Sequence, residues 1–368
     1  MKKTLRIAML GQRNSLSEFG GIDVVAGELS RRMAALGHDV TLYNRKKAVL
    51  GGHTVTEQEG VHIRYVPGFP VTGAEAASSS LCALLRAMLG NSDVVHIHGE
   101  GPSVFCFLPR LRGKKVVVTI HGLDYKRAKW GRFASSYLLL GERNAVRYAD
   151  EIIVLSKNVQ RYFEETYGRR TDFIPNGIPK ISGYTNTPTD GLTKDGFFLF
   201  LGRLVPEKGL MTLLDAYASV KTDRKLVIAG GSGEADSFVR RLKEKADPRV
   251  LFVGEVHGKE KAALFSCAHA YILPSEVEGM PLSLLEAIAG GLCCVTSDIP
   301  ECAEILEGYG LTFPKGDVAA LAQIIDCLDK DEAYVQHWRE KVRHFPRENY
   351  NWDNITERTL ELYRRNLK

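Results

Sequence analysis

Short apolar runs rich in Val and Ile alternate along the chain with longer segments in which apolar residues recur every three or four positions. The clearest helical pattern spans residues 22–36 and has Val25, Leu29 and Met33 on one stripe. The apolar runs of the first half predict strands at residues 6–10, 39–43, 61–66, 94–97, 116–120 and 152–155. Continuous apolar strands separated by helices are typical of a parallel sheet covered on both faces.

The alternation stops at a polar stretch, residues 180–195, which is rich in Thr, Pro and Gly. It then resumes and predicts strands at residues 197–201, 226–229, 250–253, 270–273 and 293–296. A break near residues 176–195 therefore predicts two α/β domains of similar length. Ligands bind beyond the carboxyl ends of the strands in such sheets, so we expect a site in a cleft between two facing sheets.

Composition narrows the class of protein. The chain is 44% hydrophobic and 25% charged, which is typical of a globular protein, and its net charge of +5 is too small to indicate nucleic-acid binding by itself. The seven cysteines show no CxxC spacing, which argues against a disulfide framework or a zinc ribbon. We find neither a signal peptide nor an apolar stretch of 18 residues, and expect a soluble cytoplasmic protein.

The strongest local signal for a binding site is the segment 272–291, in which an apolar strand leads through a short loop into a helix. Pro281 fits the first position of that helix. The free amides of Met280, Leu282 and Ser283 would then form an anion-binding site, strengthened by the helix dipole.

Two carboxylates accompany this helix start, Glu278 in the loop and Glu286 within the helix. They could hold different hydroxyl groups of one ligand whose phosphates meet the helix start. Alternatively, Glu278 is a solvated loop charge and Glu286 a residue of the helix surface. The change from strand to loop to helix favours the binding role.

Two cations follow another predicted strand, which ends at Gly202. Arg203 offers a planar fork and Lys208 a compact charge, and together they suit a diphosphate, although a solvated turn is the alternative. The glycine loop after the next strand is a weak dinucleotide fingerprint, because Asp236 stands where its last glycine is expected.

The first half offers fewer candidates. Gly20 and Gly21 precede a helical pattern and would let the backbone approach a phosphate or a sugar, unless they form an entry loop without a ligand. His121 directly follows a predicted strand, where a lone histidine more often has a structural role. His96 and His98 face the same way on one strand, but no third ligand stands out, and we predict no metal site.

Two charged segments remain. Asp329-Lys-Asp331 has the spacing that holds a metal–diphosphate in other transferases, yet it lies at a polar helix end, so we interpret it as solvated surface. The basic cluster at residues 126–132 could meet anionic lipid headgroups or an anionic acceptor, or it could be a solvated loop.

Taken together, the segments resemble a retaining glycosyltransferase of family 4. They occur in the family's order over nearly the full chain, and the ordered set is far more specific than any one motif. The matching segments are Gly20-Gly21, Gly37-His-Asp-Val40, His121-Gly122, Val154-Leu-Ser156, Ile174-Pro-Asn-Gly177, Gly202–Gly209 and the Glu-x7-Glu of Glu278 and Glu286. The stretch 119–156 looks most like a rhamnosyltransferase-like subgroup that builds bacterial surface polysaccharides.

The resemblance implies the GT-B fold, in which two Rossmann-like parallel-sheet domains face each other across a cleft. Residues 1–178 would form the acceptor-side domain and residues 179–368 the nucleotide-sugar-binding domain. Within the latter, residues 350–368 would form a helix that crosses back to the first domain.

The resemblance also implies roles for single residues. Arg203 and Lys208 would neutralise the donor diphosphate. Glu278 would hold the donor sugar, and His121 would contact it near the reacting centre; these four are the predicted catalytic residues. The predicted donor-binding residues, with Glu286 on the ribose, are Gly20, Gly21, Gly202, Gly279, Met280, Pro281, Leu282 and Glu286. Many relatives have Glu-Gly-Phe-Gly in place of Glu278-Gly-Met-Pro281, so the sugar pocket is expected to differ in shape.

The implied activity is the transfer of a sugar, with anomeric retention, from a nucleoside-diphosphate-sugar to a hydroxyl group of a glycan or lipid-linked acceptor. No metal or other cofactor is expected, and no nucleic acid. The enzyme would lie in the cytoplasm or at the inner face of the membrane. Loops 66–80 and 123–132 are the expected acceptor contacts. The alternatives are a sugar-nucleotide epimerase of the same shape, a non-catalytic sugar-nucleotide-binding protein and an NAD oxidoreductase, which lacks a complete glycine fingerprint.

Overall fold

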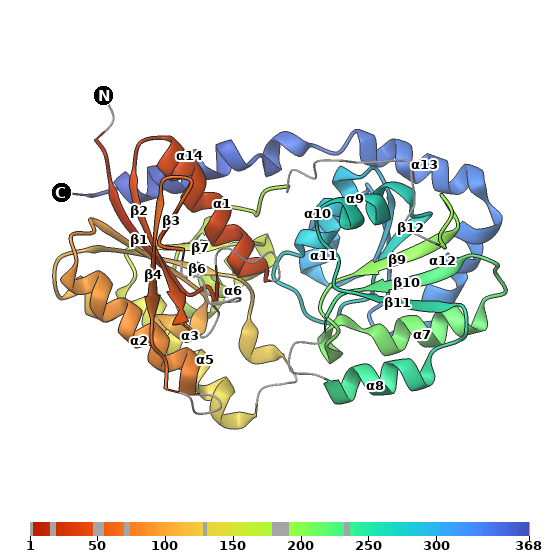
Figure 1. The fold of residues 1–368 in the computed structure, drawn as a ribbon, viewed down its shortest axis with the longest axis horizontal. Coiled ribbons are helices and arrows are strands. Elements are labelled where there is room, and N and C mark those ends of the chain that lie inside the picture. The colour runs from red at the N-terminus through yellow and green to blue at the C-terminus, as the bar shows by residue number, and fades with distance from the viewer. Residues whose placement is uncertain are drawn as a thin grey trace. The chain divides into compact units, whose positions relative to one another are not determined.

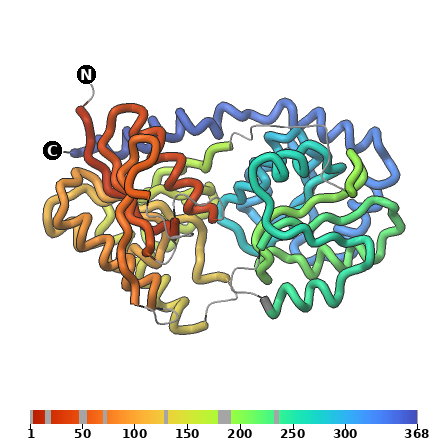
Figure 2. The backbone as a smooth tube through the Cα atoms, viewed as in Figure 1, coloured from red at the N-terminus to blue at the C-terminus, as the bar shows by residue number. Residues whose placement is uncertain are grey.

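The computed structural model describes residues 3–14, 20–46, 55–69, 74–127, 131–178, 191–231 and 236–367. The chain forms two compact units, which can be followed in Figures 1 and 2. The first unit comprises Met1–Gly177 together with Glu348–Lys368, and the second unit comprises Ile178–Arg347. The polypeptide therefore passes from one unit to the other twice.

The first unit is built on an eight-stranded sheet in the order β3-β4-β2-β1-β5-β6-β7-β8. Its strands are β1 (Arg6–Leu10), β2 (Asp39–Arg45), β3 (Glu57–Gln58), β4 (Val61–Val66), β5 (Val94–His98), β6 (Lys115–Ile120), β7 (Glu151–Val154) and β8 (Asp172–Phe173). Neighbouring strands are parallel except for β3 and β4. The six strands predicted for this half are confirmed, whereas β3 and β8 lack apolar runs and escaped the pattern.

The strands of this sheet are apolar at successive positions because both faces are covered. Ala8 and Leu10 of β1 belong to a buried cluster with side chains of α2 (Ala74–Leu89) and α5 (Arg132–Tyr148). On the other face, the sulfur of Met9 accepts a hydrogen bond from Ser30 of α1 (Gly21–Ala35). The remaining helical segments before the second unit are α3 (Glu100–Ser103), α4 (Phe107–Arg110), η2 (Asp124–Lys126) and α6 (Lys157–Tyr167).

The last helix, α14 (Trp352–Arg364), follows the short turn η4 (Arg347–Tyr350) and belongs to the first unit. It lies against α1, as Figure 1 shows. The ring of Trp352 lies so close to Gly177 that a Cβ atom there would overlap it. The phenol of Tyr363 reaches Nδ1 of His96 in β5, at 2.6 Å. These contacts fix the end of the chain to the sheet formed at its beginning.

The second unit contains a six-stranded, fully parallel sheet in the order β11-β10-β9-β12-β13-β14. Its strands are β9 (Phe197–Leu201), β10 (Lys225–Ala229), β11 (Val250–Gly254), β12 (Ala270–Leu273), β13 (Cys293–Ser297) and β14 (Leu311–Phe313). Its helical segments are η3 (Pro206–Lys208), α7 (Leu210–Ser219), α8 (Asp236–Lys245), α9 (Gly258–Cys267), α10 (Leu282–Ala289), α11 (Pro300–Leu306), α12 (Val318–Lys330) and α13 (Glu332–Arg343). The five predicted strands are confirmed, and only the three-residue β14 was missed.

Each sheet has one point at which the strand order reverses. In the first unit β1 and β5 are neighbours, and the strands that follow each of them are added on opposite sides of this pair. In the second unit β9 and β12 form the corresponding pair. Connections diverge at such a point and leave room beyond the carboxyl ends of the two strands, where α/β proteins bind their ligands. The segments after β1, β5, β9 and β12 are therefore the first places to look for a site.

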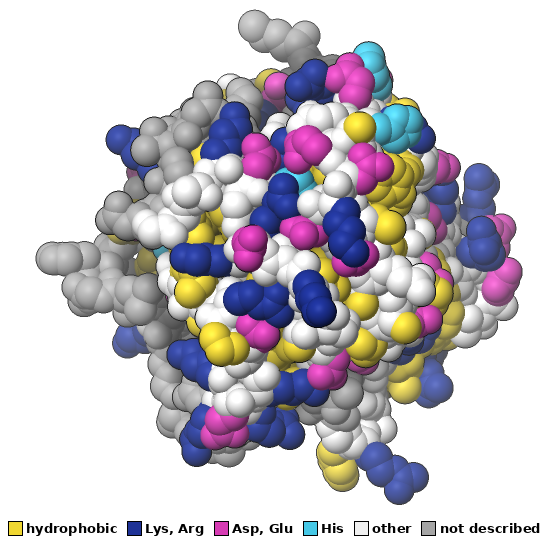
Figure 3. Space-filling model, turned by 90° about the vertical axis from the view of Figure 1, so that its right-hand side faces the viewer, with side chains coloured by type: hydrophobic (Ala, Val, Ile, Leu, Met, Phe, Trp, Pro, Cys, Tyr) yellow, Lys and Arg dark blue, Asp and Glu magenta, His cyan; other side chains and the backbone are white. Residues whose placement is uncertain are grey.

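On the face drawn in Figure 3, Lys and Arg side chains lie among Asp and Glu side chains. That face therefore presents no surface of a single charge. No helix among the described residues is long and apolar enough to cross a membrane.

Candidate functional site

The loop after β9 is held against the loop after β12, its neighbour in the second sheet. Gly209 has a φ of +65°, and a Cβ atom there would overlap the carbonyl oxygen of Pro274. Glycine is therefore required at this position both for its backbone conformation and for this close approach. The backbone N–H of Glu276 donates to the carbonyl of Glu207 at 2.9 Å. The predicted site residues of both loops thus share one small region of the second unit.

Two of the predicted catalytic residues meet there. The ammonium group of Lys208 lies 2.5 Å from Oε1 of Glu278, and the side chains are only 12% and 8% exposed. Ser275, which is buried, donates a second hydrogen bond to the same oxygen at 2.6 Å. Glu278 is therefore not a solvated loop charge. Removing one member of so sheltered a pair would leave a buried charge without its counter-ion.

Glu286 has a partner that the sequence did not reveal. Lys261 of α9 donates to Oε1 of Glu286 in α10 at 2.9 Å, with side chains 19% and 8% exposed. Glu286 is buried, so it is not a surface residue of the helix. Lys261 lies in a polar helix start, His257-Gly-Lys-Glu-Lys261, where nothing distinguishes it from its exposed neighbours. Only the packing of α9 beside α10 identifies it.

The helix after β12 begins one residue later than predicted. Pro281 is the N-cap of α10, with φ −72° and ψ 111°, and its carbonyl accepts from Leu284 at 3.2 Å and from Leu285 at 3.4 Å. An N-cap residue keeps an extended conformation while its carbonyl begins the helical hydrogen bonding. Leu282 and Ser283 are therefore the first two helical residues, and Gly279, Met280 and Pro281 are buried just before them.

The two cations predicted after β9, Arg203 and Lys208, have different surroundings. Gly202 ends the strand region and Arg203 is exposed, whereas Lys208 is bound to Glu278 as described.

In the first unit, the buried His96 and His98 and the half-buried His121 form a group at the carboxyl ends of β5 and β6. Nδ1 of His98 lies 2.9 Å from Nε2 of His121, and the rings of His96 and His98 are 4.2 Å apart. Burial lowers the pKa of His96 to about 3. Burial and the charge of Arg127 lower the pKa of His121 to about 3 as well. All three imidazoles are neutral at physiological pH, because the pKa of His98 also lies well below its ordinary value.

The ring nitrogens of His96 are both engaged. Nδ1 meets Tyr363, and Nε2 lies 2.7 Å from Oγ1 of Thr119. Nε2 of His98, by contrast, is buried and has no hydrogen-bond partner. Within the described ranges, no group of three His, Cys, Asp or Glu side chains is arranged to hold a metal ion.

The carboxyl groups of Glu100 and Glu142 are also buried in the first unit, and no sequence pattern indicates them. Glu100 follows β5 directly, and its Oε2 accepts from the N–H of Asp124 at 3.1 Å. Burial, followed by the charges of Asp124 and Glu142, raises the pKa of Glu100 to about 9, so this side chain is protonated at neutral pH. Glu142 of α5 accepts hydrogen bonds from Tyr162 at 2.9 Å and from Tyr167 at 2.5 Å.

The paired glycines stand at the start of α1. Gly20 is the extended N-cap and Gly21 the first helical residue. The Asp23 carboxylate accepts from the N–H groups of Arg13 at 2.6 Å and Asn14 at 3.1 Å, and a Cβ atom on Gly20 would lie 2.6 Å from it. Glycine at position 20 thus leaves room for the carboxylate that fixes residues 13–14. Residues 15–19, which precede the pair, lie outside the described ranges.

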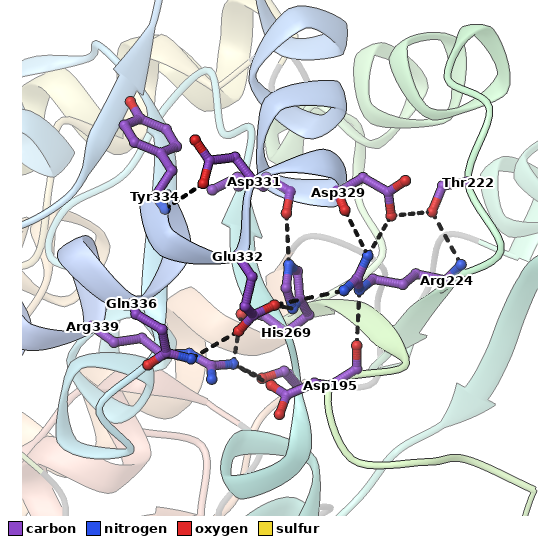
Figure 4. A network of polar contacts seen from close by, with 12 residues as sticks. Asp195, Thr222, Arg224, His269, Asp329, Asp331, Glu332, Tyr334, Gln336 and Arg339 are labelled. Carbon is purple, nitrogen blue, oxygen red and sulfur yellow. Dashed lines mark hydrogen bonds and ion pairs between the residues drawn. The ribbon is translucent and has the colours of Figure 1, made fainter.

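The interpretation of Asp329 as solvated surface is wrong. Figure 4 shows it within a polar network of the second unit, where it accepts from Thr222 at 2.5 Å and from Arg224 at 2.6 Å. Its side chain is 14% exposed, because the turn before β10 packs against the end of α12. Asp331 caps α13 by accepting from the N–H of Tyr334 at 2.9 Å. Both aspartates thus have structural partners.

The basic cluster at residues 126–132 is described in part, since residues 128–130 lie outside the described ranges. Lys126 lies 5.7 Å from the centre of the Tyr162 ring. Arg127 forms an ion pair with Asp124 at 2.8 Å and is 15% exposed, so it is not a solvated charge. Arg132 is exposed at the start of α5, and the next residue, Phe133, is 95% exposed.

Comparison with known proteins gives two family matches in succession. Residues 19–180 match the family described as Glycosyltransferase Family 4, and residues 189–345 match Glycosyl transferases group 1. The alpha-maltose-1-phosphate synthase of Mycolicibacterium smegmatis is 26% identical over 98% of this chain and 99% of its own. The glycogen synthase of Mycobacterium tuberculosis is 27% identical over 98% of this chain and 94% of its own.

Solved structures of similar fold come from the same group of enzymes. A sucrose-phosphate synthase from Thermosynechococcus elongatus has a TM-score of 0.84 at 21% identity and covers 98% of both chains. HepE of Anabaena, solved in complex with UDP-glucose, has a TM-score of 0.81 at 18% identity, over 97% of this chain and 98% of its own. These likenesses confirm the predicted two-sheet fold. With the two family matches and the named relatives, they identify the chain as a glycosyltransferase of the GT-B, family 4-like group.

Proposed function

We propose that the chain transfers a sugar from a nucleoside-diphosphate-sugar to a hydroxyl acceptor with retention of the anomeric configuration. The observation that carries this proposal is the sheltered pair of Lys208 and Glu278, placed where β9 and β12 diverge. A cation for the diphosphate and a carboxylate for the sugar are there already in contact. In the proposed site Arg203 shares the diphosphate with Lys208, and Glu286 binds the ribose hydroxyls.

The reaction breaks the bond between the anomeric carbon and the diphosphate oxygen. The acceptor oxygen then bonds to that carbon on the same face of the sugar, and its proton passes to the departing phosphate oxygen. Arg203 and Lys208 stabilise the negative charge that grows on the diphosphate, which is the main demand of this transition state. His121 is proposed to hydrogen-bond the donor sugar as a neutral imidazole, in keeping with a pKa of about 3.

We expect this mechanism to need no metal, because two side-chain cations serve the diphosphate. Activity should then persist in EDTA, and added Mg²⁺ should not raise it. Loss of activity in EDTA that Mg²⁺ restores would overturn this part of the proposal.

The experiment that tests the proposed function is a thermal-shift screen with UDP, GDP, dTDP, CDP and NAD, repeated in EDTA. A ligand that binds only the folded state raises the unfolding temperature by mass action. We expect one nucleoside diphosphate to raise it in wild type and Lys208→Ala to reduce that shift. The control is Lys245→Ala, whose pair with Asp215 is exposed. A shift with NAD alone, or with no nucleotide, would contradict the proposal.

A second arm of the experiment separates transfer from epimerisation. The donor of the identified nucleotide is incubated with and without hydroxyl acceptors, and the sugar is followed by NMR. Transfer gives a new glycoside in the acceptor's presence. Conversion of the donor sugar to its epimer without any acceptor would favour the epimerase instead.

We further propose that the acceptor belongs to bacterial surface-polysaccharide synthesis, as in the rhamnosyltransferase-like subgroup, and that it is carried on a lipid. Exposed Arg132 and Phe133 at the start of α5 support this, because a basic and an aromatic side chain together favour an anionic membrane surface. Each such charge contributes about 1 kcal/mol near an anionic bilayer.

The membrane proposal is tested with vesicles that contain phosphatidylglycerol. We expect Arg132→Gln with Phe133→Ser to weaken vesicle binding at least about fivefold, the loss expected from one interfacial charge. Arg240→Gln with Arg241→Gln, an exposed pair on α8 in the second unit, serves as the control for charge alone. Equal binding by both variants and wild type would contradict membrane association through α5.

A further inference from the structure

Ser275 stands in the loop between β12 and α10 and is fully buried. Its hydroxyl donates to Oε1 of Glu278 at 2.6 Å. Its carbonyl oxygen accepts a hydrogen bond from the hydroxyl of Ser297, which is the last residue of β13 and is also fully buried. Ser275 is therefore bound on one side to the candidate site and on the other side to a strand of the sheet.

The residues on either side of Ser275 are held as well. The carbonyl of Pro274 lies against Gly209, and the N–H of Glu276 donates to the carbonyl of Glu207 at 2.9 Å. The backbone that carries the Ser275 hydroxyl is thus fixed from both directions. A side chain on such a support can hold a second side chain in one orientation.

The two carboxylate oxygens of Glu278 have different surroundings. Oε1 accepts from Lys208 at 2.5 Å and from Ser275 at 2.6 Å. Among the described residues, no group donates a hydrogen bond to the other oxygen, Oε2, and this atom is not fully enclosed. An ionised carboxyl group can accept hydrogen bonds at both of its oxygens. Oε2 is therefore the oxygen that a ligand can reach.

The two donors to Oε1 differ in how firmly they can hold it. Lys208 carries its charge on a flexible stem, and in the proposed site its ammonium group is shared with the donor diphosphate. Ser275 is short, uncharged and buried, so a bound anion competes for its hydroxyl far less. The hydrogen bond from Ser275 can therefore hold Glu278 in place while Lys208 turns towards a diphosphate.

We propose that Ser275 is a positioning residue for the transferred sugar: it fixes Oε1 of Glu278, so that Oε2 accepts a hydrogen bond from a hydroxyl of the sugar. Ser297 supports this arrangement by holding the carbonyl of Ser275. The inference rests on the proposed function, because it requires a nucleoside-diphosphate-sugar as the donor. It goes further by naming the group that orients the carboxylate for the sugar.

A purely structural role for Ser275 makes a different prediction. Ser275 and Glu278 are three residues apart, and hydrogen bonds over such short separations also stabilise loops. Loss of a loop contact would weaken the binding of a nucleoside diphosphate and of the corresponding nucleotide-sugar to the same extent. Loss of a positioning contact weakens only the ligand that carries the sugar, because Glu278 then no longer presents Oε2 to it.

The first test therefore compares the two kinds of ligand by titration calorimetry on the whole chain. The probes are UDP with UDP-glucose, GDP with GDP-mannose and dTDP with dTDP-rhamnose, and the pair that binds the wild type is carried forward. For Ser275→Ala we expect the Kd of the nucleotide-sugar to weaken at least about fivefold, as for a lost charged hydrogen bond, and that of the nucleotide less than about twofold. Equal losses for the two ligands, or no loss, would overturn the proposal.

The matched control is Ser30→Ala. Ser30 is as fully buried as Ser275, and its hydroxyl donates to the sulfur of Met9 in the first unit at 3.3 Å. This variant loses a buried hydroxyl far from Glu278 in the sequence and should bind both ligands as the wild type does.

A double-mutant cycle tests whether Ser275 acts through Glu278. Glu278→Ala removes both oxygens, so adding Ser275→Ala should weaken the nucleotide-sugar by less than about twofold further. Additive losses would refute the positioning role. Ser297→Ala leaves both residues in place and keeps the test decisive if Glu278→Ala does not fold. We expect it to weaken the nucleotide-sugar about twofold, a fraction of one hydrogen bond, and to leave the nucleotide unaffected. A loss shared by both ligands would contradict the proposal.

The outcomes separate this inference from the proposed function. If neither nucleotides nor nucleotide-sugars bind the wild type, the proposed function fails and the inference fails with it. If the wild type binds and transfers the sugar while Ser275→Ala binds both ligands equally well, the inference fails alone.

Discussion

Both units place polar side chains at or beyond the carboxyl ends of sheet strands, but these side chains are charged in the second unit and uncharged in the first. Where β9 and β12 diverge, lysines and glutamates form the pairs Lys208–Glu278 and Lys261–Glu286. Where β5 and β6 end in the first unit, burial keeps His121 and Glu100 neutral, with pKa values of about 3 and about 9. The polar side chains of the second unit are thus paired ions, whereas those of the first unit are hydrogen-bonding groups without charge.

The largest expected effect is on folding stability, and it comes from the protonated carboxyl group of Glu100. Because the pKa of Glu100 rises from 4.5 to about 9 on folding, the unfolded protein loses this proton first as the pH increases. Glu100 therefore costs stability as pH rises from about 4.5 towards 9, by at most about 1.4 kcal/mol per pH unit. Glu100→Gln, which is neutral at every pH, should be more stable than wild type at pH 8 and similar to it at pH 4.5.

Native-state hydrogen exchange in peptides of β5 and β6 measures this difference for the first unit alone. Glu244→Gln, at an exposed position of α8, is the control. A stability difference between Glu100→Gln and wild type that does not change with pH would contradict the protonated carboxyl.

The buried histidines should change folding stability with pH in the opposite sense, because they destabilise the fold as the pH falls. The pKa values of His96 and His121 fall from 6.5 to about 3 on folding, so their contribution is fully present above pH 6.5 and is lost as the pH falls towards 3. Between pH 6.5 and 5, two such groups remove about 3 kcal/mol. The same exchange experiment should show this acid loss in β5 and β6. If the imidazole signals of both histidines titrate near pH 6.5 in NMR spectra, the neutral cluster is refuted.

Loss of a charge in the second unit should affect turnover. Lys208→Ala removes a cation from the diphosphate and leaves Glu278 without its partner, so we expect kcat to fall at least about tenfold. Lys245→Ala, whose pair with Asp215 is 43% and 41% exposed, is the matched control and should retain its turnover. A normal kcat for Lys208→Ala would remove this lysine from the mechanism.

The hydrogen bond between His98 and His121 should affect the rate of sugar transfer, because we expect it to orient the His121 ring. His98→Leu removes the hydrogen bond at 2.9 Å, and we expect kcat to fall about tenfold while the donor KM changes little. Asn places a polar atom where Nδ1 stood, so His98→Asn should recover most of the rate. The 15N shifts of His121 should change in the leucine variant only. Equal rates in the two variants would mean that His98 serves packing rather than orientation.

The smallest effect is expected at Lys261. Lys261→Met leaves the Glu286 carboxylate, whose side chain is 8% exposed, without this ion-pair partner, so we expect the donor KM to rise about threefold while kcat changes little. Lys259→Met, on the exposed side of the same helix, should change neither constant. Steady-state kinetics with varied donor distinguishes the two variants, and identical KM values would show that Lys261 does not support Glu286.

Eleven strands were predictable because each is an apolar run long enough to stand out from its neighbours, whereas β3, β8 and β14 are too short for this pattern. The site of the second unit was predictable in part, since Lys208 and Glu278 follow such runs at the edge where ligands bind. Their contact at 2.5 Å was not, because 70 residues separate them. Lys261 was missed for the same reason, since its role depends on a helix packed beside it.

The first unit was harder to interpret, because its chemistry depends on burial rather than on charge. A glutamate in the sequence Gly99-Glu100-Gly101 gives no sign that it keeps its proton. The start of α10 at Leu282 differed from the prediction by one residue, since a proline can stand at the N-cap as well as within the first turn. Asp329 was misread because its partners, Thr222 and Arg224, come from another part of the chain.

The membership of α14 in the first unit constrains the order of assembly during synthesis. Its Tyr363 completes the hydrogen bonding of His96, and Lys115 of β6 donates to the carbonyl of Arg365. Both partners leave the ribosome more than 200 residues after the strands they contact, and the whole second unit emerges in between. A ribosome-bound chain therefore holds a first unit that lacks α14 until residues 352–364 have emerged, whereas every residue of the second unit is synthesised earlier.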